Sequence, residues 1–337
     1  MRWNWEEAME PINTSYDEEE VKQAIASALE NFYGSLINKI DAINIKDVMK
    51  SKNPYLYRAK SMQTSADIIE SILQAFVSSS EETIFGNCFF EPIAIAASGG
   101  TKSATKGVDI ELHDAVSNTK FFIAVKSGTS IFNADSMKKQ GENFEEAQRT
   151  LRTSGGRIGF SAIVGYAYGT KTETGRGKAK IYEEVAGEEF WEALTGDKDF
   201  YTKIISYMDT LPEQYIDDYN ASYSRAYNRL VRDFSIEFCN PDGTIDWEKL
   251  VEYNSGSPKR KAKEELLENA EAIYHWMVSN PMISQKKLQE EVSIGGAFVK
   301  RAIAYLTEMN IVTRGYNGKA NGWTVNGPFV RDDSYFN

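Results

Sequence analysis

Apolar residues recur at helical spacing over the first part of the chain and predict two helices there. One covers about residues 17–45, and the other covers about residues 66–78 behind a cap at Thr64–Ser65. A turn-like polar segment follows at 78–83. The apolar run at 88–97 then predicts a strand. The first helix is expected to be structural.

Two short segments with alternating polarity come next, at 107–113 and 120–126. Side chains alternate between the two faces of a strand, so Asp109 and Glu111 share one face of the first segment. The second segment carries Lys126 near its end. A short polar turn joins the two segments, and this predicts that they pair as an antiparallel hairpin.

Helix and strand patterns then alternate up to about residue 238. A helix is predicted at about 135–152, and its apolar stripe includes one glutamine, Gln140. A strand is predicted at about 159–168, followed by amphipathic helical regions at 187–208 and 221–238. This order predicts a mixed α/β core in which the hairpin and the later strand share one sheet.

The composition changes at 255–263, where glycine, serine and proline are followed by a run of charges. This segment is typical of a linker, and it divides the chain into expected domains at 1–256 and 257–337. Beyond the linker the pattern predicts three helices followed by a two-stranded hairpin. The same order is found in winged helix-turn-helix modules, and the segment resembles those of prokaryotic DNA-binding regulators.

The winged-helix resemblance implies that Ala297–Met309 is the helix offered to the major groove. The basic residues of this region that we expect at DNA are Lys286, Lys287, Lys300, Arg301, Arg314 and Lys319. The alternative interpretation is a helical bundle used for dimerisation or for protein contacts, since lysine and arginine are also ordinary surface residues.

Charge changes this picture only when it is counted by segment. The chain has 38 basic and 49 acidic side chains, and its net charge of −11 argues against nucleic acid as a partner. Residues 99–181, however, have 13 basic and 8 acidic side chains, a net charge of +5, and residues 258–337 have 11 and 9, a net charge of +2. Within the first basic segment, Lys171, Arg176 and Lys178 belong to a Gly- and Thr-rich loop suited to phosphates. A solvated charge run is the alternative.

The content of cysteine and histidine excludes several kinds of chemistry. Two residues of each type are too few for a disulfide framework, a cysteine-built zinc site or a histidine-based triad. The chain shows neither a signal peptide nor an apolar run long enough to cross a membrane. We therefore expect a protein of the reduced cytoplasm without a membrane partner or an organic cofactor.

The hairpin carries residues suited to phosphodiester hydrolysis. This reaction needs a divalent metal and a cation that stabilises the pentavalent charge, and carboxylates supply the oxygen ligands that Mg²⁺ prefers. Asp109 and Lys126 meet this requirement across neighbouring strands, which lie about 4.8 Å apart. Glu111 projects to the same face as Asp109, and Glu70 can approach from the preceding helix. A surface ion pair on a structural hairpin is the alternative.

The run GVDIEL, a polar turn, FFIAVKSG and a helix containing Gln140 resemble the PD-(D/E)xK nuclease superfamily, and more closely its type II restriction endonucleases. Further similar stretches extend the resemblance over roughly residues 50–235. It implies that Asp109 is a metal-binding aspartate, that Lys126 is the lysine of the motif, and that Glu70 is the acidic residue of the preceding helix. Gln140 would lie near the site. The implied cofactor is Mg²⁺, and the implied partners are double-stranded DNA and a second copy of the chain.

The sequence departs from the family pattern at position 124, where alanine stands in place of glutamate or aspartate. Three explanations remain open. They are migration of the acidic group to Glu111, Glu142 or Glu145, an engineered substitution at Ala124 that traps an uncut complex, and a degenerate nuclease that only binds.

These observations predict a prokaryotic type II restriction endonuclease that cuts double-stranded DNA with Mg²⁺. In this interpretation the winged helix reads part of the sequence or a methylated base, and cleavage of both strands favours a homodimer. The alternative is a winged-helix DNA-binding protein or regulator whose nuclease domain is inactive. A protein-interaction scaffold is a third class.

Overall fold

The computed structural model describes residues 11–153, 158–171, 180–292, 294–316 and 321–332. The chain divides into two compact units. The first contains residues 1–48 and 61–245 and is called the catalytic unit, because it carries the hairpin that the sequence predicts to be catalytic; the second, called the C-terminal unit, contains residues 49–60 and 246–337. The predicted domain boundary between residues 256 and 257 stays a prediction.

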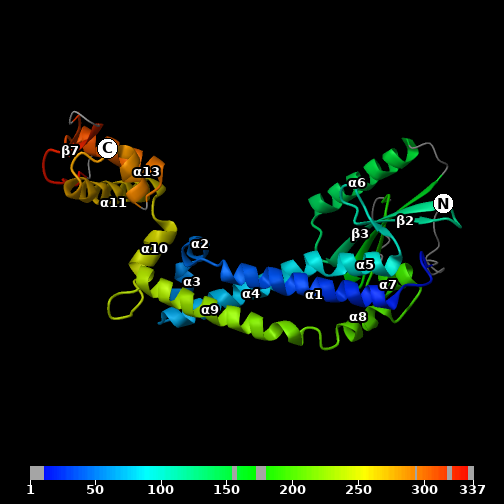
Figure 1. Ribbon diagram of the computed structural model, residues 1–337. Helices are drawn as coiled ribbons and strands as arrows, with labels where there is room; N and C mark the ends of the chain where they lie inside the picture. The colour runs from blue at the N-terminus through cyan, green and yellow to red at the C-terminus, as the bar shows by residue number, and fades with distance from the viewer. Residues whose placement is uncertain (1–10, 154–157, 172–179, 293, 317–320, 333–337) are drawn as a thin grey trace. The chain divides into compact units, whose positions relative to one another are not determined.

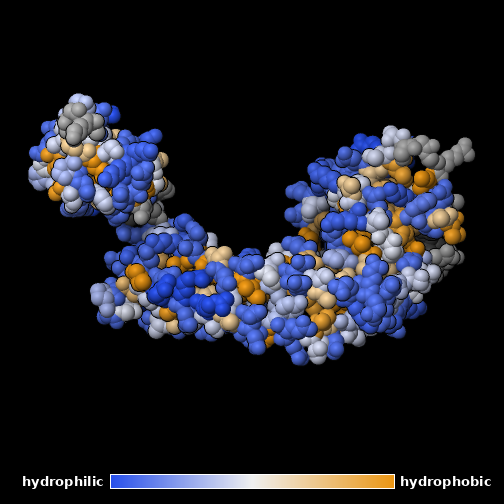
Figure 2. Space-filling model, viewed as in Figure 1, coloured by the Kyte–Doolittle hydropathy of each residue, from blue (hydrophilic) through white to orange (hydrophobic). Residues whose placement is uncertain are grey.

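Three long helices of the catalytic unit pack side by side, as Figure 1 shows. They are α1 (Glu18–Asp41), α4 (Ser65–Cys88) and α9 (Glu213–Phe238). Two of them begin at side-chain caps: the Asp17 carboxylate accepts from backbone N–H groups of α1, and Thr64 forms a capping box at the start of α4. Hydrophilic residues cover most of the helical face seen in Figure 2, with isolated apolar side chains between them. The two helices predicted for this region are confirmed.

Two predictions in this region are wrong. The segment at 78–83 is not a turn but part of α4, where the hydroxyls of Ser80 and Thr83 donate to carbonyls one turn earlier in the same helix. The apolar run at 88–97 is not a strand but lies mostly in helix α5 (Phe90–Ser98). Pro92 falls in the first turn of α5, where a backbone N–H has no intrahelical acceptor to lose.

The catalytic unit contains one mixed five-stranded sheet. Its strands are β1 (Thr101–Lys102), β2 (Ile110–Asp114), β3 (Thr119–Gly128), β4 (Gly159–Tyr168) and β5 (Glu183–Ala186), and they lie in this order. β1, β2 and β3 pair antiparallel, whereas β3, β4 and β5 pair parallel. The predicted hairpin, the predicted strand at 159–168 and the mixed α/β core with a shared sheet are confirmed.

Different helices cover the two faces of this sheet (Figure 1). On one face Ile123 and Val125 belong to a core formed with α1, α5, α7 (Glu188–Thr195) and α8 (Phe200–Met208). On the other face Phe122 and Ala124 pack with Phe144 of α6 (Ala134–Thr153). The alternation predicted for β3 therefore holds, and Lys126 belongs to the α6 face.

The C-terminal unit has its own apolar core, formed mainly by three helices and a hairpin. Its elements are α3 (Pro54–Ala59), α10 (Trp247–Ser255), α11 (Pro258–Ser279), α12 (Gln285–Glu291), α13 (Gly296–Glu308), β6 (Val312–Tyr316) and β7 (Asn321–Val325); α2 (Ile45–Lys50) spans the division between the units. The segment at 255–263, predicted as a linker, is largely helical, because Pro258 begins α11 at a position that proline favours. None of the described helices is long and apolar enough to cross a membrane.

Candidate active site

Asp109 and Lys126 meet at the edge of the hairpin, as the sequence predicted. Asp109 lies immediately before β2, and its backbone N–H donates to the carbonyl of Ile123 at 2.9 Å. One of its carboxylate oxygens, Oδ2, accepts from the backbone N–H of Val125 at 2.7 Å and from Lys126 Nζ at 3.2 Å. Both side chains are 23% exposed. The pair is therefore held in place by β3 and still reaches solvent.

The Lys126 ammonium lies between two oxygens of different kinds. It donates to the Asp109 carboxylate at 3.2 Å and to the backbone carbonyl of Val125 at 3.0 Å. A carboxylate oxygen and a carbonyl oxygen side by side are ligands of the type that divalent cations bind in proteins. The Lys126 ammonium therefore lies at a place suited to a cation.

The turn before Asp109 is fixed by two polar residues of α6. Gln140 is buried, and its Nε2 donates to the carbonyl of Gly107 at 2.7 Å. Asn143, also buried, lies so close to Gly107 that a Cβ at this position would clash with its side-chain amide. Gly107 also has a φ of +72°, which disfavours other residues. The structure thus places Gln140 at the turn rather than at the ion pair. Sequence reasoning missed Asn143, although its position three residues after Gln140 puts both side chains on the same side of α6.

Glu111 has different surroundings from Asp109. Its carboxylate accepts from Ser103 Oγ at 2.5 Å, from Thr105 Oγ1 at 2.9 Å and from Lys120 Nζ at 2.5 Å. Burial alone would raise the pKa of Glu111, but the hydrogen bonds from Lys120 and the two hydroxyls outweigh it and hold the pKa below its ordinary value. Glu111 is already occupied by protein donors, and it secures the loop that leads to Asp109.

Glu70 is not brought to the pair. It is exposed on α4, and its Oε1 accepts from Gln74 of the same helix at 3.3 Å. α4 meets β3 at Gly86, where a Cβ would lie 3.0 Å from the hydroxyl of Ser127. Residue 86 is 16 positions after residue 70, so the two positions are about 24 Å apart along the helix axis. Glu70 therefore lies far along α4 from the contact with β3.

The other candidates for the missing acidic group do not fill its place either. Ala124 is fully buried in the core beneath α6. Glu142 and Glu145 are exposed on α6, and Glu142 pairs with Lys139 at 3.0 Å. In the part of the chain that the structure describes, no three His, Cys, Asp or Glu residues form a cluster able to hold a metal ion. Among described residues, Asp109 is the candidate carboxylate next to Lys126.

A second charged cluster lies on the neighbouring strands. Tyr166 of β4 is the partner of Lys126 in the strand register, and its hydroxyl donates to Glu184 of β5 at 2.6 Å. Lys171 and Lys180 also pair with Glu184. Burial alone would raise the pKa of Glu184, but the hydrogen bonds from the two lysines and the tyrosine outweigh it and lower the pKa to about 2. Sequence reasoning missed Tyr166 and Glu184, and it assigned to DNA a lysine, Lys171, that pairs with Glu184.

The remaining basic residues predicted at DNA are exposed wherever the structure describes them. They are Lys286, Lys287, Lys300, Arg301 and Arg314. Arg176, Lys178 and Lys319 lie outside the described residues. Lys286 is 88% exposed and lies 4.0 Å from Glu290, which is too open an ion pair to restrain it. These side chains are free to contact a large anionic partner.

A comparison with known families bears on the catalytic unit. A family model described as type II restriction endonuclease EcoO109I matches residues 19–214, more than half of the chain. The match includes the hairpin with Asp109 and Lys126 and ends before residue 246, where the larger segment of the C-terminal unit begins. No curated protein matches the chain. The chain therefore belongs to the EcoO109I family of type II restriction endonucleases, and it is a site-specific endodeoxyribonuclease that acts on double-stranded DNA.

Proposed function

We propose that this endonuclease hydrolyses DNA with Mg²⁺ at the Asp109–Lys126 pair. The observation that carries the proposal is the position of the Lys126 ammonium, 3.2 Å from the Asp109 carboxylate and 3.0 Å from the Val125 carbonyl. The Asp109 carboxylate, through the oxygen that Lys126 does not contact, and the Val125 carbonyl would hold the metal. Mg²⁺ is often bound by one or two carboxylates, with water and substrate phosphates completing its shell, so a single aspartate fits this role.

The protein groups and the metal divide the work. When bound, Mg²⁺ polarises the scissile phosphate and acidifies a water. Lys126 supplies a fixed positive charge beside Asp109, which stabilises the negative charge that grows on the phosphate. Gln140 and Glu111 hold the loop before Asp109, so its carboxylate is oriented before DNA arrives.

The role of position 124 is tested by restoring the family residue. Cleavage with Mg²⁺ is compared between the chain with Ala124 and the variant Ala124→Glu. A large gain shows that the acidic group is missing from this chain, whereas an unchanged rate supports a site built on Asp109 or a carboxylate elsewhere. No cleavage by either form supports a degenerate nuclease and contradicts the proposal.

We also propose that α11, α12, α13 and the β6–β7 hairpin form a winged helix that contacts DNA. Their order and the exposure of Lys300 and Arg301 on α13 support this proposal. Such a module would read part of the recognition sequence or a methylated base. Cutting both strands favours two active sites, and we therefore propose a homodimer.

A plasmid digest tests these proposals together. Methylated and unmethylated plasmids are incubated with and without Mg²⁺, and Asp109→Asn serves as the matched inactive control. Discrete fragments that require both Mg²⁺ and Asp109 are expected, and a difference between the plasmids would show methylation sensitivity. If no lane contains discrete fragments, cleavage at this pair is contradicted.

A further inference from the structure

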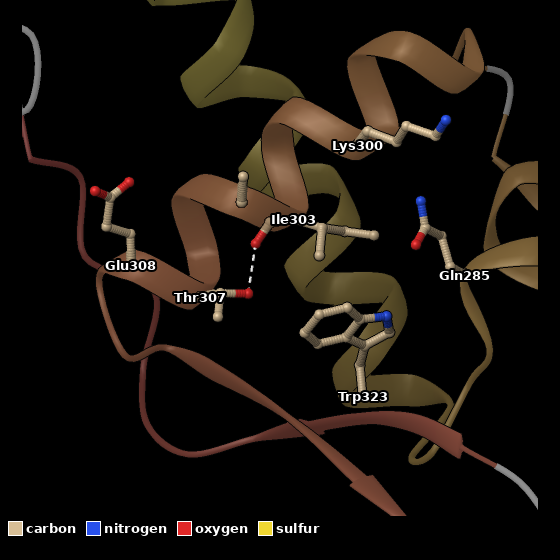
Figure 3. Close-up of a pocket in the computed structure, with 7 residues that line it drawn as sticks. Gln285, Lys300, Ile303, Thr307, Glu308 and Trp323 are labelled. Carbon is tan, nitrogen blue, oxygen red and sulfur yellow. Dashed lines mark hydrogen bonds between the residues drawn. The ribbon is translucent and has the colours of Figure 1, made fainter.

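A groove of about 530 Å³ runs along α13 in the C-terminal unit. Its walls come from the start of α12, from one side of α13 and from β7, as Figure 3 shows. Its lining residues are Gln285, Lys300, Ile303, Ala304, Thr307, Glu308 and Trp323. The volume is within the range of sites that bind small molecules.

The Trp323 wall of the groove is rigid. The backbone N–H of Trp323 donates to the carbonyl of Ile283 at 3.1 Å, and the N–H of Met282 donates to the carbonyl of Trp323 at 3.0 Å. Gly322 permits this close approach, because a Cβ there would clash with the Met282 backbone. The indole is half-buried and forms one side of the groove (Figure 3). A flat aromatic surface is thus fixed before any ligand binds.

The polar groups are placed at the ends of the groove. The side chains of Lys300 and Gln285 point toward one another at one end, above the nitrogen side of the Trp323 indole, and Glu308 lies at the other end (Figure 3). Ile303 lies between them and provides an apolar contact. No carboxylate among the described residues forms an ion pair with Lys300, so its charge is available to an anion.

We infer that this groove binds one unpaired nucleotide of DNA. The base lies against Trp323 and Ile303, the phosphate pairs with Lys300, and the Gln285 amide meets the hydrogen-bonding edge of the base. An aromatic wall beside a single cation fits a planar ring that carries an anionic group. The inference rests on the proposed DNA contact of the C-terminal unit and adds that the ligand is a base turned out of the duplex.

The test measures binding of two labelled duplexes by fluorescence anisotropy in EDTA, which prevents metal-dependent cleavage. One duplex is fully paired, and the other has the same sequence with one unpaired nucleotide. The full-length protein is expected to prefer the second duplex by about tenfold, the magnitude of one base stacked on an aromatic ring. Trp323→Ala should remove the preference and leave binding of the paired duplex within about twofold, while Trp323→Phe should keep most of it.

The controls separate this inference from the proposed function. Trp276→Phe changes another half-buried tryptophan of the same unit, one that does not line the groove, and it should keep the preference. Lys300→Met and Arg301→Met should weaken binding of both duplexes and lower the salt dependence by about one unit of slope each. Two results would overturn the groove inference while leaving the DNA role of the unit intact, provided that Lys300→Met and Arg301→Met weaken binding. In the first, Trp323→Ala retains the preference for the unpaired nucleotide; in the second, the unaltered chain shows no such preference. If neither basic residue affects either duplex, the DNA role of the unit is overturned as well.

Discussion

Two carboxylate–lysine pairs cross the β2–β3 hairpin, and they differ in how many protein donors each carboxylate already has. Glu111 accepts from Lys120 and from two hydroxyls, those of Ser103 and Thr105. Asp109 accepts from Lys126 and from one backbone N–H through a single oxygen, Oδ2, and no side-chain hydroxyl of the described residues donates to either of its oxygens. The first carboxylate has little capacity left for a ligand, whereas the second retains an oxygen for one.

The comparison shows that a shared strand face does not imply a shared role. Asp109 and Glu111 are two positions apart in the sequence, beside the start of β2. On residue type alone, either carboxylate could be a metal ligand. The hydrogen-bond donors around each carboxylate distinguish the two residues. We expect Asp109 to act in catalysis and Glu111 to act as a structural carboxylate that orients the loop before it.

The largest effect is expected at the Asp109–Lys126 pair. Asp109→Asn and Lys126→Met should each lower the cleavage rate by about 10³-fold, because each removes a charge that acts on the reacting phosphate. Single-turnover cleavage with Mg²⁺ measures the rate. Lys120→Met is the matched control from the other pair, and a loss there as large as that of Lys126→Met would contradict the division of roles.

A smaller effect is expected at Gln140. Gln140→Glu keeps the size of the side chain but places a carboxylate oxygen against the Gly107 carbonyl in place of the donor. The turn before Asp109 should shift, and the cleavage rate should fall by about tenfold with unchanged DNA affinity. Two quantities are measured: the cleavage rate at saturating DNA, and the dissociation constant of the DNA complex in EDTA. A change confined to DNA affinity would show that Gln140 does not position Asp109.

A still smaller effect on activity is expected at Glu111. Glu111→Gln keeps an oxygen that accepts from Ser103 and Thr105, so cleavage should fall by less than about fivefold, far less than the loss expected for Asp109→Asn. The substitution should also lower stability. The folded-state pKa of Glu111 lies below its ordinary value, so its contribution is present above the unfolded pKa and is lost as the pH falls through the folded one.

Chemical denaturation of the natural chain and Glu111→Gln between pH 7 and pH 3 measures this difference. The gap in unfolding free energy should be widest near pH 7 and should narrow in acid. A rate loss comparable to that of Asp109→Asn would assign Glu111 to the metal site.

The smallest effect on cleavage is expected at Glu184, which pairs with both Lys171 and Lys180. Glu184→Gln should leave the cleavage rate within about twofold and lower stability at pH 7 by on the order of 1–2 kcal/mol. Its pKa of about 2 is below the ordinary value of 4.5, so the stabilisation is present above about pH 5 and is lost as the pH falls toward 2. Thermal unfolding of both proteins across this pH range checks the prediction. A stability difference between them that grows in acid would contradict it.

Local patterns predicted much of the catalytic unit. Alternation along 120–126 placed Lys126 on the face of Ala124, and helical spacing placed Gln140 among core residues of α6. The same reasoning failed at 78–83 and 88–97. Polar hydroxyls can be satisfied inside a helix, and a short apolar run fits a buried helix as well as a strand.

The sequence by itself determined that Asp109, Glu111 and Lys126 belong to one hairpin, because strand geometry repeats every two residues. It did not determine which carboxylate is already occupied. Ser103, Thr105 and Lys120 meet at Glu111 only after the loop and both strands have folded. Hydrogen bonds act over about 3 Å, so the donors around a carboxylate depend on tertiary placement, and this placement separates the candidate catalytic carboxylate from the structural one.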